Sequence, residues 1–236
     1  MQAPTFITGA NRGIGLALTE ALLAADHSVV ATCRNPQKAG QLHALGKAHP
    51  HRLRILPLDV TDDASVDSLA ATLIRDRLPL ALLINNAGAM EAGFGLDNAN
   101  REEFDRVFRT NVSAPFFLVK SLLPCLRMGA PARVVQISSI LGSIASRTPE
   151  MGFRCYAYNS SKCALNMLSV MLAEELAGDQ IDVTLLHPGW VATEMGGKEA
   201  PLQPRDSAAG LLRVIGRLQT GESGQFLDYE GNPLPW

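Results

Sequence analysis

The sequence has almost no net charge. Lysine and arginine together number 21 and aspartate and glutamate 23, which leaves a formal net charge of −2 at pH 7. Such a balance provides no field that would gather nucleic acid or an anionic membrane. Neither is therefore expected as a partner, and a small molecule is favoured.

Long apolar runs are also missing. A membrane-spanning helix needs roughly 18 or more apolar residues in a row, and the densest stretch, Leu78 to Ile84, is short enough to be a buried strand. The opening Met1-Gln2-Ala3-Pro4 lacks the basic and apolar regions of a secretory signal. We therefore expect a cytoplasmic protein without a membrane segment.

Cysteine is scarce and shows no metal-binding spacing. The four cysteines are Cys33, Cys125, Cys155 and Cys163. None belongs to the close pairs that zinc sites and redox motifs use, so we interpret all four as reduced packing residues. The loosely clustered histidines are His43, His49 and His51. They lack a nearby carboxylate or thiol partner, so a solvated loop is the favoured interpretation and no metal is expected.

The chain does contain a regular alternation of two patterns. Apolar, β-branched runs indicate strands at 4–8, 28–33, 52–58, 80–85, 133–138, 181–187 and 224–228. Helical periodicity fills 13–25, 37–48, 63–77, 101–126, 156–177 and 207–218. Strands that are apolar along their whole length are typical of a parallel sheet covered on both faces. The prediction is a single-domain α/β Rossmann fold over 1–236, with a doubly wound parallel sheet of about seven strands.

Two of the predicted helices carry more apolar surface than one sheet can cover. Helix 156–177 is apolar nearly all round, and segment 101–126 is rich in phenylalanine, valine and leucine. Excess apolar surface of this kind needs a cover beyond the chain's own sheet. We expect a second copy of the chain there, which gives a homodimer or a homotetramer.

The first strand runs into a glycine-rich turn, and helical periodicity follows at once. Glycine lets a backbone approach a phosphate closely, and the N–H groups at a helix N-terminus stabilise its charge. The spacing is G-x-x-x-G-x-G rather than G-x-G-x-x-G, so a purely structural turn is the alternative. The position favours a dinucleotide cradle. Its predicted contacts are Gly9, Asn11, Arg12, Gly13, Ile14 and Gly15.

The end of the second strand bears on which dinucleotide is bound. Folds that prefer NAD place an acidic residue there for the ribose 2′-hydroxyl, whereas this chain has Cys33 followed by Arg34. Arg34 and Arg12 offer guanidinium groups suited to a 2′-phosphate. Unless both are ordinary surface charges, the sequence favours NADP(H) over NAD(H).

A phenol and an ammonium are spaced to share one face of a helix. Tyr158 and Lys162 are four residues apart in a helical segment, so their side chains can act as a pair. A nearby cation stabilises a phenolate, and Lys162 is therefore expected to lower the pKa of Tyr158 toward neutrality. Tyr158 becomes the candidate proton donor, with an ordinary helix-surface pair as the alternative.

Two further candidates lie near the ends of other elements. The fifth predicted strand delivers Ser138 and Ser139 to its C-terminal end, where open α/β sheets bind ligands and a hydroxyl can polarise a carbonyl. Pro115 has no N–H for the carbonyl of Asn111. That carbonyl can accept from a water that reaches Lys162, unless the proline simply kinks the helix.

A set of motifs spans essentially the whole chain. They are Thr8-Gly9 through Gly15, Asn85-Asn86-Ala87-Gly88, Asn111, Ile137-Ser138-Ser139, Tyr158 with Lys162, and His187-Pro188-Gly189. The set resembles the short-chain dehydrogenase/reductase family. Within that family, the stretch from Ser139 to Ser143 and the ending from Asp228 to Trp236 resemble the C-factor and sniffer-like carbonyl reductases.

The resemblance implies roles for individual residues. The implied cofactor contacts are Asp59 and Val60 at the adenine, Asn86, Ala87 and Gly88 along the cofactor, Val191 and Thr193 near the nicotinamide carboxamide, and Pro188, Gly189, Tyr158 and Lys162. The implied catalytic residues are Tyr158 as proton donor, Ser139 at the carbonyl oxygen, Lys162 on the nicotinamide ribose and Asn111 in a water relay.

The predicted reaction is the NADP(H)-dependent reduction of a ketone or aldehyde, or in reverse the oxidation of a secondary alcohol. A cofactor-binding sensor of the C-factor type with little turnover is the alternative, and an epimerase or dehydratase would need a larger C-terminal region. Loops 89–100, 140–156 and 190–206 decide the substrate. Their large apolar residues, which suggest an apolar pocket, are Met90, Phe94, Met151, Phe153, Trp190 and Met195.

Overall fold

The computed structural model describes residues 3–149, 152 and 154–236. Within them, seven strands form one parallel sheet in the order β3-β2-β1-β4-β5-β6-β7. The strands are β1 (Thr5–Ile7), β2 (Val29–Cys33), β3 (Leu53–Pro57), β4 (Leu82–Asn85), β5 (Ala132–Ile137), β6 (Ile181–His187) and β7 (Gln225–Asp228). Each follows one of the apolar runs in the sequence. The predicted parallel sheet of about seven strands is confirmed.

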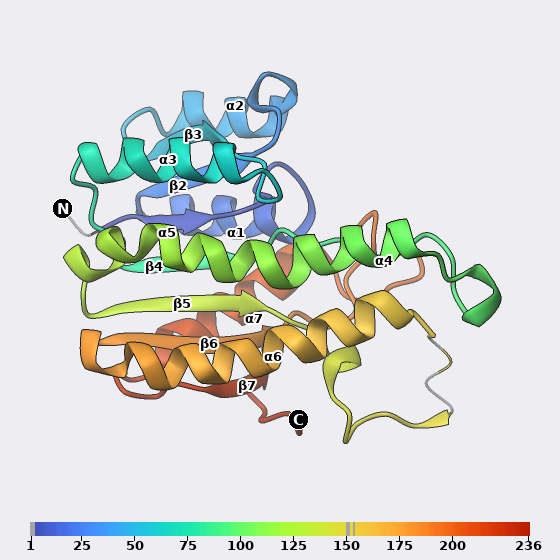
Figure 1. Cartoon of the computed structure of the whole chain (residues 1–236). Helices are drawn as coiled ribbons and strands as arrows, with labels where there is room; N and C mark the ends of the chain where they lie inside the picture. Colours follow the sequence, from blue (N-terminus) through green and yellow to red (C-terminus); the bar gives the residue numbers. More distant parts are fainter. Residues whose placement is uncertain (1–2, 150–151, 153) are drawn as a thin grey trace.

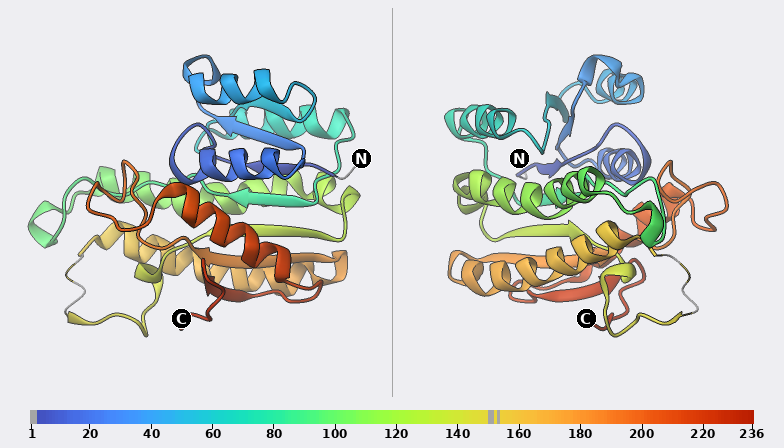
Figure 2. Two further views of the ribbon diagram at one scale, coloured as in Figure 1. Left: turned by 180° about the vertical axis from the view of Figure 1, so that it is seen from behind. Right: turned by 45° about the vertical axis from the view of Figure 1, so that its right-hand side comes forward.

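Helices cover both faces of this sheet (Figures 1 and 2). They are α1 (Gly13–Ala24), α2 (Gly40–Ala48), α3 (Asp63–Arg75), α4 (Arg101–Phe108), α5 (Ala114–Met128), α6 (Tyr156–Leu176) and α7 (Pro204–Arg217). One buried cluster lies under α3, α5 and α6, and a second under α1, α2 and α7. Because a buried aliphatic side chain contributes roughly 1.5–3 kcal/mol by leaving water, these clusters drive the doubly wound arrangement.

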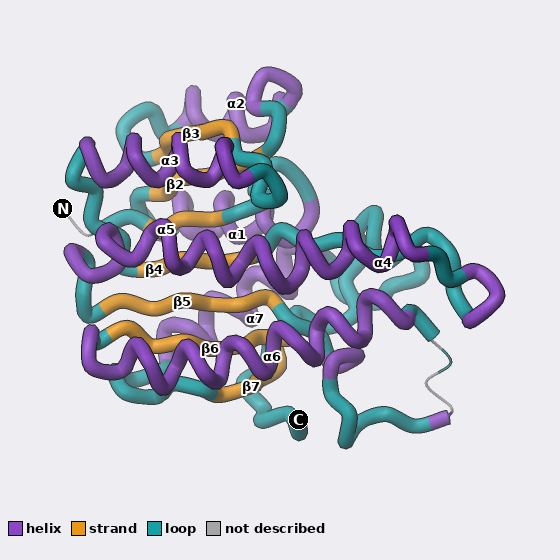
Figure 3. Tube along the Cα trace, in the orientation of Figure 1, coloured by secondary structure: helices purple, strands orange, loops and turns teal. Residues whose placement is uncertain are grey.

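The strand order reverses between β1 and β4. The chain passes from β1 outward to β2 and β3, and then crosses back so that β4 pairs with the other side of β1. In open α/β sheets, the loops beyond the carboxyl ends of the strands leave a crevice at such a point. Because the strands are parallel, the loops that follow β1, β4, β5 and β6 emerge at the same end of the sheet (Figure 3).

The segment 101–126 is helical as predicted, but it is not a uniform α-helix. A π-helical turn, η3 (Arg109–Ser113), separates α4 from α5. A π turn pairs an N–H with the carbonyl five residues earlier instead of four. Pro115, which has no N–H to give, lies directly after η3 in the first turn of α5. The wider turn carries Asn111.

Two other helix boundaries differ from the predicted ones. The predicted helix 37–48 is a short 3₁₀ turn, η1 (Pro36–Lys38), followed by α2. The predicted helix 207–218 begins earlier, at Pro204, because proline is favoured in the first turn of a helix, where its missing N–H costs nothing. Among the described residues, no helix combines the length and the apolar composition that crossing a membrane requires.

Candidate active site

The turn between β1 and α1 is built on glycines at positions where a side chain would be strained or would clash. Gly9 and Gly13 have φ angles of +62° and +55°, which glycine adopts without cost. A Cβ on Gly15 would lie 2.4 Å from the carbonyl oxygen of Gly9 and 2.5 Å from Nδ2 of Asn86. The turn, the start of α1 and the end of β4 therefore meet closely, in the shape that a phosphate cradle needs.

The N-terminus of α1 is available to an anion. Arg12, its N-cap residue, places no side-chain hydrogen bond on the first turn in the part of the chain that the structure describes. The first N–H groups and the positive end of the helix dipole can therefore bind a phosphate, with Asn11, Gly13 and Ile14 partly exposed beside it. The Arg12 guanidinium forms an ion pair with Glu194, a contact that the sequence did not predict.

Thr8 and Asn86 tie this turn to the segment that follows β4. The Thr8 hydroxyl oxygen accepts from the N–H groups of Asn86 and Ala87, both at 2.9 Å. The Asn86 amide donates to the carbonyl oxygens of Thr8 at 2.8 Å and Gly9 at 3.2 Å. The Asn86 side chain is thus engaged in holding the two strand ends together, and the backbone from Asn86 to Gly88 lies along the crevice. The sequence placed Thr8 in the glycine-turn motif but did not indicate these hydrogen bonds.

Arg34 and Asp59 lie at the ends of β2 and β3. Burial raises the pKa of Asp59, but hydrogen bonds from Thr61 and the charges of Arg34 and Arg109 lower it overall. The carboxylate accepts from the Thr61 N–H at 2.9 Å and from its hydroxyl at 2.7 Å. Val60 packs against the core beside this turn. Arg34 is exposed and places a cation where NAD-preferring folds carry an acid.

The first turns of α6 carry Tyr158 and Lys162 into the same crevice. Both are buried, with 8% and 4% of their surface exposed. Nζ of Lys162 lies 5.7 Å from the centroid of the Tyr158 ring, so the two side chains share one face of the helix as the spacing predicts. Nζ also donates to the carbonyl oxygen of Ile137 at 2.7 Å, which anchors the lysine to the end of β5.

The predicted direction of the Tyr158 pKa shift is wrong. Burial raises the pKa of Tyr158 to about 12, against a lowering influence of its hydrogen bond with Ser139, and Cys155 and Glu91 raise it further. Burial also lowers the pKa of Lys162 to about 8. A low-dielectric surrounding disfavours the phenolate and the ammonium alike, and burial is the largest cause of both shifts. At neutral pH Tyr158 is a neutral phenol with a proton to give.

The two serines that follow β5 have different partners. Ser138 donates its hydroxyl to Oδ1 of Asn166 at 2.5 Å, a fully buried bond that joins β5 to α6. Ser139 is the N-cap of a short 3₁₀ turn, η4 (Ile140–Gly142), where its oxygen accepts from the Leu141 N–H at 3.2 Å. Of the two, Ser139 is the one whose side chain lowers the pKa of Tyr158, so it is the serine placed to act on a ligand.

Asn111 links the π turn to both sides of the crevice. Its amide forms a pair of hydrogen bonds with the backbone of Ala89, accepting from the N–H and donating to the carbonyl oxygen, both at 2.8 Å. The same amide donates to the hydroxyl of Ser161 at 3.0 Å. A Cβ on Gly88 would lie 3.6 Å from Asn111 Oδ1 and 3.9 Å from Lys162 Nζ. The role of the Asn111 backbone carbonyl in a water relay stays a prediction.

The segment after β6 closes the crevice against the glycine turn. A Cβ on Gly13 would lie 3.2 Å from the methyl group of Thr193, so Thr193 lies directly against that turn. Gly189 has a φ of +84°, and Pro188 accepts a 2.7 Å bond from the hydroxyl of Ser207 on α7. Val191, two residues before Thr193, is buried. Of this segment, Thr193 therefore lies beside the cradle.

Glu91, which the sequence did not indicate as a site residue, caps the first turn of α6. Glu91, in the loop after β4, accepts from the N–H groups of Ala157 at 2.8 Å and Tyr158 at 3.0 Å. A residue 66 positions upstream gives no local signal that it will cap this helix, because no periodicity connects the two segments. Only the folded arrangement places its carboxylate there.

The predicted apolar pocket residues lie on loops around the crevice. Phe94, Trp190 and Met195 are 51%, 49% and 43% exposed, and Met90 is partly buried. Met151 and Phe153 lie outside the described residues. Large exposed apolar side chains on the loops that follow β4 and β6 offer contact area to an apolar ligand.

The cysteines behave as packing residues. Cys33, Cys125 and Cys155 are buried and Cys163 is partly exposed, and all four are free thiols. Burial raises the pKa of the three buried thiols, which keeps them protonated and unreactive. Over the residues that the structure describes, no three histidine, cysteine or acidic side chains are grouped to hold a metal ion.

Comparison with known proteins adds an independent line of evidence. A family model for short chain dehydrogenases matches residues 4–203. The C-signal of Myxococcus xanthus is 40% identical over 158 residues, which are 67% of this chain and 93% of that protein. An NADPH-bound carbonyl reductase from chicken fatty liver is 38% identical with a TM-score of 0.93, and the carbonyl reductase Sniffer of D. melanogaster is 34% identical with a TM-score of 0.92. Both structural matches cover 100% of each chain.

Proposed function

Because the chain belongs to the short-chain dehydrogenase family, we propose that it is an NADP(H)-dependent oxidoreductase that reduces an aldehyde or ketone and, in reverse, oxidises a secondary alcohol. The observation that carries this proposal is the meeting of Ser139, Tyr158 and Lys162 in one crevice with the glycine cradle of α1. The similar structures whose titles name a carbonyl reductase support the direction of the chemistry.

The cradle fits a phosphorylated dinucleotide. The close approach at Gly15 leaves the backbone open to a pyrophosphate, which the N–H groups of α1 would hold. Arg34 and Arg12 would bind the 2′-phosphate, and a carboxylate that would repel it is missing at the end of β2. Thr193 lies against the glycine turn, where it would contact the cofactor.

The proposed proton transfer uses a phenol that is kept neutral. NADPH, when bound, supplies the hydride. Tyr158 holds its proton at neutral pH because burial raises its pKa to about 12, and it would release that proton to the alkoxide oxygen as negative charge develops there. The Ser139 hydroxyl, which already bonds to Tyr158, would donate to the same oxygen and stabilise its charge.

Lys162 and Asn111 have supporting roles beside Tyr158 in this proposal. The Lys162 ammonium, anchored on the Ile137 carbonyl, would hold the nicotinamide ribose and stabilise the phenolate left after proton transfer. Asn111 fixes the backbone at Ala89 and the hydroxyl of Ser161, which keeps the α6 face and the loop after β4 in register. We propose a small apolar carbonyl compound or alcohol as substrate, in keeping with exposed Phe94, Trp190 and Met195.

We further propose that a second copy of the chain covers α5 and α6. The two helices lie side by side on one face of the sheet (Figure 1). There Phe117, Met167 and Met171 are 50%, 64% and 56% exposed, more apolar surface than a monomer usually leaves in water. Sedimentation equilibrium should give the mass of a dimer or tetramer, and a mass of one chain would contradict this proposal.

The free thiols suit a cytoplasmic location.

The test of the function is NADPH consumption in the presence of a panel of aldehydes and ketones, with product identified. Steady turnover with any of them supports the reductase. Tight NADPH binding without turnover across a broad panel would instead support a cofactor-binding sensor. Absence of cofactor binding would contradict both.

A further inference from the structure

The first turn of α6 is capped from a distant part of the chain. Cys155, its N-cap residue, provides no side-chain hydrogen bond to the first turn among the described residues. Instead, the two carboxylate oxygens of Glu91 accept one N–H each, from Ala157 at 2.8 Å and from Tyr158 at 3.0 Å. A carboxylate at a helix N-terminus binds orphan N–H groups and is stabilised by the helix dipole. Here one of those N–H groups belongs to the proton donor itself.

The segment that carries Glu91 is held on both sides. Before it, Ala89 is fixed by two 2.8 Å bonds with the Asn111 amide. On either side of Glu91, the carbonyl oxygen of Met90 accepts from Arg106 on α4 at 2.8 Å, and the N–H of Ala92 donates to Glu103 at 3.2 Å. Arg106 and Glu103 in turn pair with each other at 2.8 Å. The carboxylate is therefore presented to α6 by a fixed stretch of backbone.

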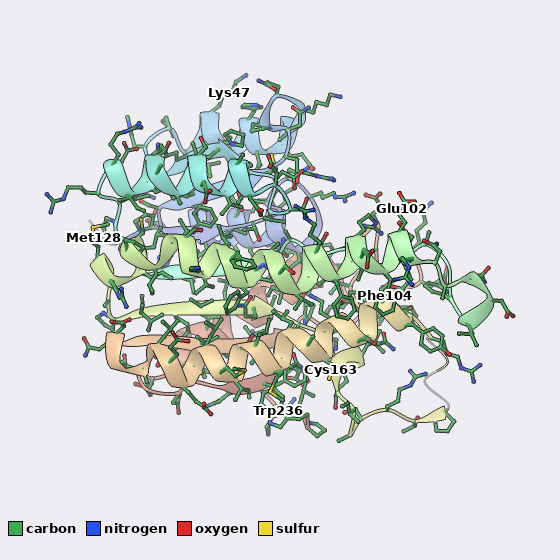
Figure 4. The ribbon with its side chains drawn as sticks, in the orientation of Figure 1. Lys47, Glu102, Phe104, Met128, Cys163 and Trp236 are labelled. Carbon is green, nitrogen blue, oxygen red and sulfur yellow. The ribbon has the colours of Figure 1, made fainter. Side chains whose placement is uncertain are left out.

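The same stretch continues from the turn that lines the cofactor crevice. Gly88 is next to Ala89, and its Cα lies near Asn111 and Lys162. Glu91 lines a small pocket between α4 and the first turn of α6, together with Phe104 on α4, which is labelled in Figure 4, and Ala157 on α6. A displacement of this loop would therefore move the first turn of α6 relative to the crevice, unless the contact through Glu91 were lost.

Charged and titratable groups surround Tyr158 from four segments. Lys162 lies on α6 itself, Cys155 directly precedes it, Ser139 follows β5 and Glu91 follows β4. On the far side of Glu91, the positive charge of Arg106 on α4 faces it. Glu91 raises the pKa of Tyr158, and its removal has a defined sign: the pKa of Tyr158 falls.

We propose that Glu91 is a positioning residue of the active site, which holds the first turn of α6, and with it the phenol of Tyr158, in register with the loop that follows the Asn86–Gly88 turn. The role rests on the proposed reductase function. Glu91 acts through the backbone of Tyr158 and touches neither substrate nor cofactor in this scheme. Its loss therefore affects the proton-transfer step and leaves cofactor affinity unchanged.

Three variants at this position separate the geometric and the electrostatic parts. Glu91→Ala removes both acceptors, Glu91→Gln removes the charge and keeps one acceptor, and Glu91→Asp keeps the charge. The matched control is Glu222→Ala. Glu222 accepts from the N–H of Gln219 at 2.7 Å in the turn between α7 and β7, beside the amino end of β6, whereas Tyr158 lies near the carboxyl ends of the strands.

The first readout is independent of turnover. In the cofactor-free protein, amide hydrogen exchange at Ala157 and Tyr158 should become about tenfold faster in Glu91→Ala, because two charge-assisted hydrogen bonds are lost. The Glu222→Ala control should leave these two amides unchanged. Unchanged exchange in Glu91→Ala would overturn the role of Glu91, whatever the turnover of the protein.

The second readout is the kinetics of carbonyl reduction with NADPH. Glu91→Ala should lower kcat by about 10- to 100-fold, as small misplacements of reacting groups do, with the Kd for NADPH unchanged and most of the loss restored in Glu91→Asp. Glu91→Gln, which keeps one acceptor, should have a kcat between those of Glu91→Ala and Glu91→Asp. A normal kcat in Glu91→Ala would overturn the proposal. Absence of turnover in the wild type would overturn the reductase function instead.

Discussion

The cofactor cradle and the catalytic cluster lie in one crevice but are built in different ways. The cradle between β1 and α1 uses backbone: two positive φ angles, a close approach at Gly15 and the free N–H groups of a helix start. The catalytic cluster uses side chains from separate segments, Asn111 from η3, Ser139 after β5, and Tyr158 and Lys162 on α6. Those side chains are buried, whereas Arg12 and Arg34 are exposed.

Because of this difference, we expect the cradle to determine cofactor affinity and the catalytic cluster to determine the rate of the chemical step. An exposed arginine at the cradle changes how tightly a charged ligand binds, and solvent moderates its effect. A buried phenol or ammonium pays a desolvation cost in the free protein and acts on the chemical step. Substitutions at the cradle should therefore appear in Kd, and those in the cluster should appear in kcat or in stability.

The largest expected effect comes from the catalytic side. Tyr158→Phe removes the proton donor and should lower kcat by about 10³- to 10⁴-fold, with the Kd for NADPH little changed. Steady-state kinetics and a fluorescence titration with NADPH measure the two quantities. Tyr156→Phe is the matched control, since Tyr156 is two residues earlier on α6 and 43% exposed, and it should keep full activity. Full turnover in Tyr158→Phe would break the contrast between the two regions.

A smaller effect is expected from the cradle. Arg34→Ala removes a charge-assisted contact with the 2′-phosphate and should weaken NADPH binding by about 10- to 100-fold, with kcat at saturating NADPH unchanged. NADH binding should not change, because NADH has no 2′-phosphate. Titration of both cofactors tests this, with the exposed Arg217→Ala as control. An equal loss for both cofactors would assign Arg34 to structure rather than to phosphate recognition.

The smallest effect is on stability and comes from the catalytic side. Lys162→Met should raise the unfolding free energy of the cofactor-free protein at pH 7 by about 1 kcal/mol, because a buried ammonium is replaced by an apolar chain. The folded pKa of about 8 lies below the unfolded value of 10.5, so the unfolded chain binds more protons between them. Lys162 should therefore make wild-type stability rise from pH 8 toward pH 10, whereas the raised pKa values of Cys33, Cys125 and Cys155, and above pH 10 that of Tyr158, act in the opposite direction.

Denaturant unfolding across this pH range measures the slope in both proteins. The Lys162→Met variant should lack the rise that Lys162 causes, and the exposed Lys47→Met should keep it (Figure 4). An identical slope in wild type and Lys162→Met would show that Lys162 is not desolvated as the structure indicates.

The same contrast explains which features could be predicted from the sequence. Backbone requirements leave local signs, so the glycine turn and the apolar strands were predicted at their places. The helical segment over 101–126 was also correct, but the π turn within it was not predicted, because the periodicity of the apolar residues continues through η3 and only Pro115 marks the wider turn. The spacing of Tyr158 and Lys162 also correctly predicted a shared helix face.

Side-chain surroundings leave weaker signs. The predicted lowering of the Tyr158 pKa was wrong because a four-residue spacing reports the distance to Lys162 and not the burial of both groups. Ser138 and Ser139 are adjacent in sequence, and only the position of Asn166 on α6 assigns the first to packing. Glu91 reaches α6 from 66 residues upstream, which no local pattern records.

The central claim is that the neutral phenol of Tyr158 faces the reactive end of a nicotinamide held by the glycine cradle. A crystal structure with NADPH and a carbonyl ligand measures this directly. The account predicts the pyrophosphate on the first turn of α1, and the carbonyl oxygen within hydrogen-bond reach of both the Tyr158 phenol and the Ser139 hydroxyl. A ligand that lies elsewhere, or a Tyr158 hydroxyl turned away from it, would contradict the account.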